Sequence, residues 1–345
     1  MTRSKFEERL IAINNYIQQV NVTLSFIHIY LWDNDKKKNR VIQYALGKKV
    51  QTKQNKDFTP DILIQLNSSC GIVVELKRSL PKNETDRDLW EQSFNQLKEY
   101  DQELIGWFTS NKKIDEQDLI LLIDEKLVVL VEDYIKDKNL EFDSYAKNFA
   151  IIGFGNRTID VFPATIFRKH TGNLRAFNGI DNLFRIGITV SWSFFETSRL
   201  TQIKFTDVQP PIEYLMETIW VDLGTFLTPE VFDRIKEEGE RRTIPIEVSV
   251  PVLSKRIRET YTKSESRNVI NNELVKEALD NFVKIKYAEK IDENAYVLKW
   301  RTTKMTYEGE DERLKVFTKK LIAYNDKEDS KPKEETMDKF LPNEN

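Results

Sequence analysis

The 345-residue chain has a single cysteine, Cys70, and only two histidines, His28 and His170. One cysteine excludes an intramolecular disulfide framework and a cluster of thiolate metal ligands, and it is typical of a cytoplasmic protein. The two histidines do not form a ligand set, and neither is close to Cys70 in the sequence. Chemistry that depends on a thiol nucleophile or on paired histidines is therefore not expected.

The chain also lacks a long hydrophobic run and a strong net charge. Its longest apolar stretch, residues 119–131, is interrupted by Asp124, Glu125 and Lys126, so no membrane span is expected. The formal charge is −3, which gives no global sign of nucleic-acid binding, although a local basic patch would suffice to bind phosphates. With 40% hydrophobic and 32% charged residues the composition is that of a soluble protein of two or three domains.

Residues 58–79 carry the most informative pattern in the chain. Two short apolar runs, residues 62–66 and 72–76, flank a polar segment of turn-forming residues. Apolar runs of this length, rich in aliphatic and β-branched side chains and bounded by turn formers, predict a β-hairpin.

Three charged residues lie at the ends of these two runs. Asp61 follows Pro60 just before the first run, and Glu75 and Lys77 close the second. Because side chains alternate along a strand, Glu75 and Lys77 share one face and Leu76 lies on the other. Pro60-Asp61 followed by Glu75-Leu76-Lys77 resembles the signature of the PD-(D/E)xK nuclease superfamily. The resemblance implies a restriction-endonuclease-like core and metal-dependent hydrolysis of phosphodiester bonds.

These residue types suit that chemistry. Asp61 and Glu75 would supply the hard oxygen ligands that Mg²⁺ (or Mn²⁺) prefers, and the backbone carbonyl of Leu76 is a further candidate ligand. Lys77 would orient the attacking water or stabilise the charge that develops in the transition state. The simpler alternative is an edge-strand salt bridge between Glu75 and Lys77, with Asp61 as a turn residue.

A second motif lies in the helix that apolar periodicity predicts at residues 89–104. Gln96 and Tyr100 are four residues apart and so share a helical face. Their spacing resembles the QxxxY motif of the RecB-like members of the superfamily. This resemblance implies that both side chains flank the metal site and contact substrate or catalytic residues. The alternative is that Tyr100 is a core residue.

The first predicted helix, residues 5–20, offers one more acidic residue. Members of the superfamily often place a glutamate there, and Glu7 lies beside the apolar face of this helix while Glu8 points away from it. Glu7 is therefore a further candidate for the catalytic set. The alternative is a solvated first-turn charge that the helix dipole favours.

The remaining pattern indicates an α/β fold. Strands are predicted at residues 22–31, 41–50, 119–123 and 149–154, and a helix at residues 127–135. Together with the hairpin they predict a mixed central sheet flanked by helices, in a nuclease domain of residues 1–157. Residues 158–210, with strand-like runs at 162–167 and 183–195, would either extend this sheet or form a connecting module.

Pro210 and Pro211 mark a domain boundary, beyond which residues 211–305 are expected to be mainly helical. Helices are predicted at residues 212–226, 228–241, 253–261 and 272–283. Residues 278–300 resemble the last helix and the wing of a winged-helix domain. Residues 306–345 are expected to form a helix and a polar, disordered tail.

The positive charge of the chain is concentrated in this second domain, where residues 241–305 hold 14 Lys and Arg against 9 Asp and Glu. Lys255, Arg256, Arg258 and Lys263 lie on or beside the helix at 253–261, where a recognition helix would contact DNA phosphates. The alternative is a protein–protein module with a solvated basic face.

These features predict a metal-dependent nuclease, most simply a DNA endonuclease in restriction, antiphage defence or mobile-element processing. Cutting both strands with one site per chain implies a homodimer. The layout also resembles the end-cleaving subunits of some cut-and-paste transposons, which work with partner proteins. The competing hypothesis is a non-catalytic DNA-binding or complex-assembly protein that keeps the nuclease-like core as a scaffold. Cleavage of RNA is a third possibility.

Overall fold

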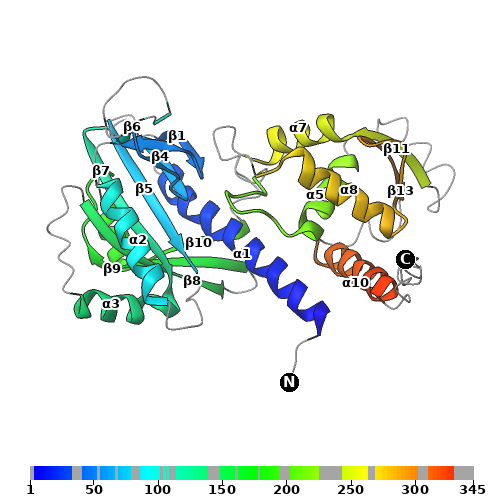
Figure 1. Cartoon of the computed structure of the whole chain (residues 1–345). Coiled ribbons are helices and arrows are strands. Elements are labelled where there is room, and N and C mark those ends of the chain that lie inside the picture. The colour runs from blue at the N-terminus through cyan, green and yellow to red at the C-terminus, as the bar shows by residue number, and fades with distance from the viewer. Residues whose placement is uncertain are drawn as a thin grey trace, which may run out of the picture. The chain divides into compact units, whose positions relative to one another are not determined.

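The computed structural model describes fifteen ranges: residues 4–32, 41–52, 55–66, 69–78, 86–101, 104–105, 107–108, 114–138, 148–159, 162–177, 179–193, 203–224, 243–262, 269–301 and 310–329. The chain divides into two compact units (Figure 1). The first, called here the sheet unit, consists of Asn15–Gln209 and Lys255–Ile270. The second, called the helical unit, consists of Met1–Asn14, Pro210–Ser254 and Asn271–Asn345.

The sheet unit is built on a seven-stranded sheet of order β1-β4-β5-β7-β8-β9-β10. Its strands are β1 (Val41–Leu46), β4 (Ile62–Leu66), β5 (Cys70–Lys77), β7 (Glu116–Asp124), β8 (Asn148–Ile159), β9 (Phe162–Gly172) and β10 (Ile188–Ser191). The pairs β5–β7 and β7–β8 are parallel and the others are antiparallel. Three short strands, β2 (Val50–Thr52), β3 (Asp57–Phe58) and β6 (Leu104–Ile105), form a separate small sheet. The predicted α/β class with a mixed sheet is confirmed.

Helices cover both faces of the large sheet, which explains why residues 119–123 in the middle of β7 are all apolar. Side chains on one face of β7, such as Leu119 and Leu121, are buried in a core shared with α2 (Asp86–Tyr100) and α3 (Val128–Asp137). On the other face, α1 (Lys5–Trp32) packs the ring of Phe26 against Phe167 of β9 at 5.8 Å. A central parallel strand covered on both sides has no solvated face for polar residues.

The strand predicted at residues 22–31 is wrong, because these residues continue α1. Their β-branched and aromatic composition favours a strand locally, but propensity is a weak prior that burial overrides. Val22, Phe26, Ile27 and Tyr30 are all fully buried. A helix that is buried on all sides is apolar all round and shows little amphipathic periodicity. His28 accordingly lies in a helix.

The strand predicted at residues 183–195 is wrong in its first part. Residues Ile180–Ile186 form the short helix α4, which ends at Gly187 with φ +105° before β10 begins. Glycine is the residue that adopts this backbone conformation without steric cost. Because β9 pairs with β8 and β10 pairs with β9, the large sheet continues beyond residue 157.

The helical unit contains a small antiparallel sheet of order β11-β13-β12. Its elements are α5 (Ile212–Gly224), β11 (Thr243–Ser249), the start of α7 (Val250–Tyr261), α8 (Asn272–Lys284), β12 (Ala288–Lys290), β13 (Ala295–Arg301) and α10 (Glu310–Asp329), together with the start of α1. The predicted helices at 212–226, 253–261 and 272–283 correspond to α5, α7 and α8. The helix expected beyond residue 306 corresponds to α10.

The core of the helical unit is an aromatic cluster around Trp220 of α5. The Trp220 ring lies 5.4–6.3 Å from the rings of Phe282, Tyr287, Trp300 and Phe317. Packing of this kind joins α5, α8 and α10 with the hairpin of β12 and β13.

A buried ion pair lies beside this cluster. Glu217 of α5 is fully buried, and Nε and Nη2 of Arg313 on α10 both donate to its Oε1, at 3.0 and 2.6 Å. The pair therefore joins α5 and α10 inside the helical unit.

Several predictions lie outside the described residues. They include the helix at residues 228–241, Lys263, and the polar tail from residue 330 onwards. Within the described part of the chain, no helix is both long enough and apolar enough to cross a membrane.

Arg313→Ala tests the buried ion pair. It would leave a fully buried carboxylate without its cation, so we expect a loss of about 3–5 kcal/mol in the free energy of unfolding. Lys315→Ala on the same helix is the control, because it removes only an exposed pair with Glu312. Urea unfolding followed by tryptophan fluorescence, which reports on Trp220, measures both variants. Equal, small shifts of the two midpoints would contradict a structural role for Arg313.

Candidate active site

The pairing of β4 with β5 brings Asp61 and Glu75 together at the open end of the hairpin. The last pair in this ladder is Ile62 with Val74. Asp61 therefore stands opposite Glu75, one residue beyond that pair. The Asp61 carboxylate also accepts the backbone N–H of Leu76 through Oδ2, which fixes its direction. The predicted hairpin thus delivers two acidic side chains to one place.

Glu75 is only 4% exposed and contacts three polar side chains. Its Oε1 accepts from Nζ of Lys77 at 2.8 Å. Its Oε2 accepts from Nε2 of Gln96 at 3.2 Å and from Oη of Tyr100 at 3.4 Å. Gln96 Nε2 and Tyr100 Oη also contact each other. The structure thus brings together five of the predicted site residues. Lys77, Gln96 and Tyr100 contact Glu75, and Asp61 stands opposite Glu75 at the start of β4.

Helix α2 can position Gln96 and Tyr100 because its apolar side chains anchor it on the sheet. Phe94 and Leu97, on the same helix, are buried in the core shared with the sheet. One turn separates Gln96 from Tyr100, so both reach the end of β5. The Tyr100 ring is itself buried and packs edge-on against Phe58 at 5.6 Å. Tyr100 is therefore at once a core residue and a partner of Glu75.

The electrostatics of the group follow from burial of two neighbouring acids. Burial, and then repulsion from Glu75 and Asp207, raises the pKa of Asp61 well above its usual value. Burial also raises the pKa of Glu75, although attraction to Lys77 offsets part of the rise. Partial burial alone would lower the pKa of Lys77, but Glu75 outweighs it and the net shift is upward. Lys77 is therefore an ammonium ion at neutral pH.

Asp207 is an acidic residue that the sequence analysis missed. Its negative charge raises the pKa values of Asp61, Glu75 and Lys77 alike. The preceding residue is held against α1, because the backbone N–H of Thr206 donates to Tyr16 Oη at 3.3 Å. Asp207 is far from the hairpin in sequence and lies in no motif, so only the tertiary fold reveals its position.

Asp61 and Glu75 could hold a divalent cation, although they provide only two carboxylate ligands. Among the described residues, no group of three or more His, Cys, Asp and Glu is arranged to hold an ion. Mg²⁺ is commonly held by one or two carboxylates, with water and a substrate phosphate completing its shell. Asp61 and Glu75 provide two such carboxylates, and a cation between them would relieve the repulsion that raises the pKa of Asp61.

Glu7 is not among the contacts of this site. It closes a capping box at the start of α1, where its Oε2 accepts the N–H of Ser4 at 3.1 Å and its own N–H donates to Ser4 Oγ at 3.3 Å. Glu7 belongs to the helical unit, whereas the residues around Glu75 belong to the sheet unit. These contacts favour the local role of a first-turn acid. A catalytic role for Glu7, and a ligand role for the carbonyl of Leu76, stay predictions.

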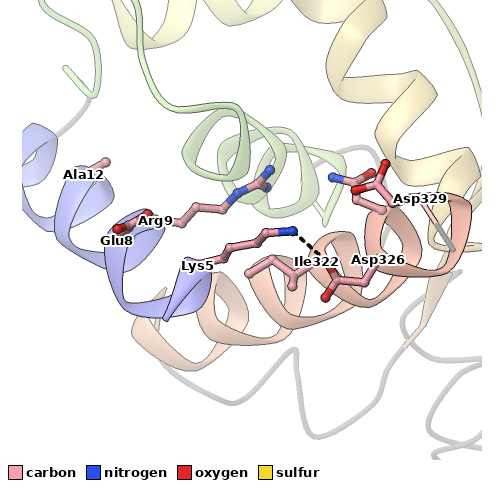
Figure 2. Close-up of a pocket in the computed structure, with 8 residues that line it drawn as sticks. Lys5, Glu8, Arg9, Ala12, Ile322, Asp326 and Asp329 are labelled. Atoms are coloured by element: carbon pink, nitrogen blue, oxygen red, sulfur yellow. Dashed lines mark hydrogen bonds and ion pairs between the residues drawn. The ribbon is translucent and has the colours of Figure 1, made fainter. Parts of the chain in front are cut away.

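A pocket in the helical unit lies between the start of α1 and α10 (Figure 2). It is lined by Lys5, Glu8, Arg9, Ala12, Ile322, Asn325, Asp326 and Asp329. Lys5 pairs with Asp326 at 2.9 Å, and Arg9 pairs with Glu213 at 2.6 Å. Its two cations are therefore already neutralised, and none of the residues around Glu75 lines it.

The basic residues predicted to contact DNA lie on α7. Lys255, Arg256 and Arg258 are on this helix, and Lys255 also forms a loose i,i+4 pair with Glu259 at 3.9 Å. The helix that leads directly into the hairpin of β12 and β13 is α8. The DNA-contact prediction therefore concerns α7, whereas α8 is the helix that precedes the hairpin.

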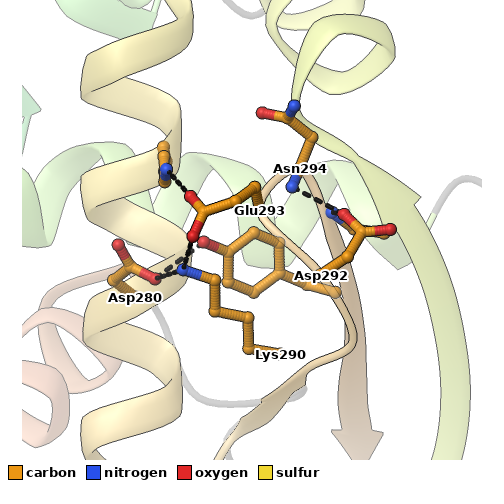
Figure 3. A network of polar contacts seen from close by, with 8 residues as sticks. Asp280, Lys290, Asp292, Glu293 and Asn294 are labelled. Carbon is orange, nitrogen blue, oxygen red and sulfur yellow. Dashed lines mark hydrogen bonds and ion pairs between the residues drawn. The ribbon is translucent and has the colours of Figure 1, made fainter.

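The α8–hairpin face, residues 272–300, carries five lysines and six carboxylates. Lys290 lies 3.8 Å from both Asp280 and Glu293 (Figure 3), and Lys276 contacts Glu293 at 2.5 Å. Tyr296 donates to Asp280 at 2.7 Å. Because the carboxylates of this face outnumber its lysines, the net positive charge of residues 241–305 comes from elsewhere in that range.

The chain matches no protein-family model, no curated protein and no solved structure. Its function must be inferred from the contacts of Glu75 and from the arrangement of strands and helices around them.

The raised pKa values predict how stability depends on pH when no metal ion is bound. Asp61 and Glu75 have higher pKa values in the folded chain, so above about pH 4 the folded state binds more protons than the unfolded state. The free energy of unfolding should therefore fall as pH rises. Asp61→Asn, which cannot ionise there, should flatten this dependence.

Urea unfolding in EDTA over a pH series measures the slope. Asp118, whose pKa burial raises to about 6, contributes a slope of the same sign in both proteins and serves as an internal reference. Identical profiles for the wild type and Asp61→Asn would contradict the raised pKa of Asp61.

Proposed function

We propose that the chain is a metal-dependent nuclease that hydrolyses phosphodiester bonds, most simply in DNA. The observation that carries the proposal is the surroundings of Glu75, with Asp61 opposite and Lys77, Gln96 and Tyr100 in contact. A structural ion pair would account for Glu75 and Lys77. It gives no reason to place a second, partly buried carboxylate beside Glu75 at a cost in stability.

The order of elements supports the same proposal. Helix α1, the antiparallel strands β1, β4 and β5, helix α2 and the parallel strand β7 follow the order expected of a restriction-endonuclease-like core. Asp61 precedes the second of these antiparallel strands, and Glu75 and Lys77 end the third. The QxxxY pair on α2 adds the RecB-like feature at the position where that resemblance expects it.

The proposed mechanism gives each residue a separate task. Asp61 and Glu75 would hold Mg²⁺ or Mn²⁺, which supplies charge neutralisation and activation of water when bound. Lys77, as an ammonium ion, stabilises the negative charge that grows on the phosphate oxygens in the transition state. Gln96 and Tyr100 hold the Glu75 carboxylate in one orientation, so that little reorganisation accompanies the reaction.

The segment from α5 to β13 supports DNA as the substrate. The succession α5, β11, α7, α8, β12 and β13, with strand order β11-β13-β12, resembles that expected of a winged-helix domain. Because carboxylates outnumber lysines on the α8–hairpin face, we assign the phosphate contacts to Lys255, Arg256 and Arg258 on α7, with Lys263 beyond it.

The biological setting is part of the proposal. A DNA endonuclease of this kind fits restriction, antiphage defence or mobile-element processing in the cytoplasm, and Cys70, a free thiol, suits a reducing compartment. With one centre per chain, cutting both strands requires a homodimer or a partner protein of a defence or transposition complex.

The alternative is a non-catalytic DNA-binding or complex-assembly protein. The small ligand set favours it, because no group of three or more His, Cys, Asp and Glu arranged to hold an ion is found among the described residues. RNA cleavage remains within the first proposal, since the chemistry at phosphorus is the same.

A nuclease assay of purified variants tests the proposal. With Mg²⁺ or Mn²⁺, the wild type should cleave plasmid or linear DNA, and Lys77→Ala and Asp61→Ala should each reduce the rate by about 100-fold or more, because each removes charge stabilisation in a dry site. Lys98→Ala, which changes an exposed residue of α2, should leave the rate unchanged. RNA of the same sequence separates the two polymers.

Equal cleavage by all four proteins would mean a contaminating nuclease and would end the claim. Absence of cleavage by the wild type on both polymers, with either metal, would favour the non-catalytic alternative.

The assignment of DNA contacts to α7 has its own test. Replacing Lys255, Arg256 and Arg258 together by alanine should weaken DNA binding, and the slope of log K against log salt should fall by about one for each phosphate that the protein no longer neutralises. The charge-neutral double variant Lys276→Ala/Glu293→Ala should keep the slope of the wild type. Fluorescence anisotropy measures both, and equal slopes in all three proteins would contradict the assignment.

A further inference from the structure

Arg78, the residue after Lys77, is a partly buried cation that forms no ion pair with a carboxylate among the described residues. Its Nη1 donates to the backbone carbonyl of Asn15 on α1, and its Nε is buried with no hydrogen-bond partner in the part of the chain that the structure describes. Burial lowers the pKa of the guanidinium to about 10, and the charge of Asp124 offsets only part of this. The surroundings of Arg78 therefore disfavour its charged form.

Three other arginines of the described residues are neutralised by acids. Arg9 pairs with Glu213 at 2.6 Å, Arg157 with Glu125 at 3.1 Å, and Arg313 with Glu217 at 2.6 Å. Among the described residues, no ion pair joins Arg78 to an acid. A buried charge without compensation costs several kcal/mol in general, and a bound anion would remove part of that cost.

The position of Arg78 indicates which anion. It follows β5 directly, at the carboxyl end of a parallel strand, and Lys77 beside it is in register with Ile123 of β7. Ligands of open α/β sheets bind outside the carboxyl ends of the strands. A guanidinium with free N–H groups is suited to a phosphate, which it can contact through two parallel hydrogen bonds.

We propose that Arg78 binds a backbone phosphate of the nucleic-acid substrate, next to the phosphate that reacts at Asp61, Glu75 and Lys77. This inference rests on the proposed nuclease function and adds to it a substrate-positioning residue. Side-chain alternation places Arg78 on the face of β5 opposite to Lys77, the face that α1 covers. The two cations would therefore contact different phosphates of one strand.

The test is the salt dependence of DNA binding, measured by fluorescence anisotropy with a labelled duplex and Ca²⁺ in place of Mg²⁺ to limit cleavage. Arg78→Gln should weaken binding about tenfold and reduce the slope of log K against log salt by about one. Arg78→Lys keeps the charge but loses the paired hydrogen bonds, so it should restore the slope and only part of the affinity. Arg157→Gln, which breaks an exposed ion pair on β8, is the matched control and should bind as the wild type does.

A purely structural role for Arg78 would lower the unfolding midpoint and leave the slope unchanged in Arg78→Gln. That result, or an affinity equal to that of the wild type, overturns the inference. If the wild type cleaves DNA and Arg78→Gln binds it with an unchanged slope, this inference alone fails. If the wild type neither binds nor cleaves any polymer, the proposed function fails with it.

Discussion

The burial of Glu75 is the constraint on which the centre of the sheet unit depends. A carboxylate with 4% exposure must find partners inside the protein, and it finds them on two elements: Lys77 on its own strand, and Gln96 and Tyr100 on α2. These contacts fix α2 against β5 and leave Asp61 with an acidic neighbour. An apolar residue at this position would give a more stable protein, so the arrangement favours a chemical purpose over stability.

The parts of the site that the sequence predicts are those set by local geometry. Turn formers between two apolar runs predict the hairpin of β4 and β5, and alternation along a strand is enough to pair Glu75 with Lys77. Spacing by one helical turn is enough to bring Gln96 and Tyr100 to a common partner. Each of these relations spans only a few residues along one element, and antiparallel pairing then adds Asp61.

The parts that escape the sequence depend on contacts between distant segments. The second half of α1 has the composition of a strand and becomes a helix that is buried almost all round in the folded chain. Asp207 belongs to no motif and reaches the site only because Thr206 is held by Tyr16. The surroundings of Arg78 are likewise a property of the folded chain, since nothing in its neighbourhood along the sequence shows that its Nη1 reaches the carbonyl of Asn15 on α1.

The register of β4 against β5 also determines which changes of length the hairpin can absorb. Asp61 and Glu75 lie at the open end of the ladder, and the connection from Leu66 to Cys70 lies at the other. A residue added in that connection leaves Ile62 opposite Val74. A residue added within β5 before Glu75 turns that carboxylate to the other face of the sheet. Changes of length are thus tolerated in the connection between the two strands. Within β5, a single inserted or deleted residue before Glu75 separates its carboxylate from Lys77 and from α2.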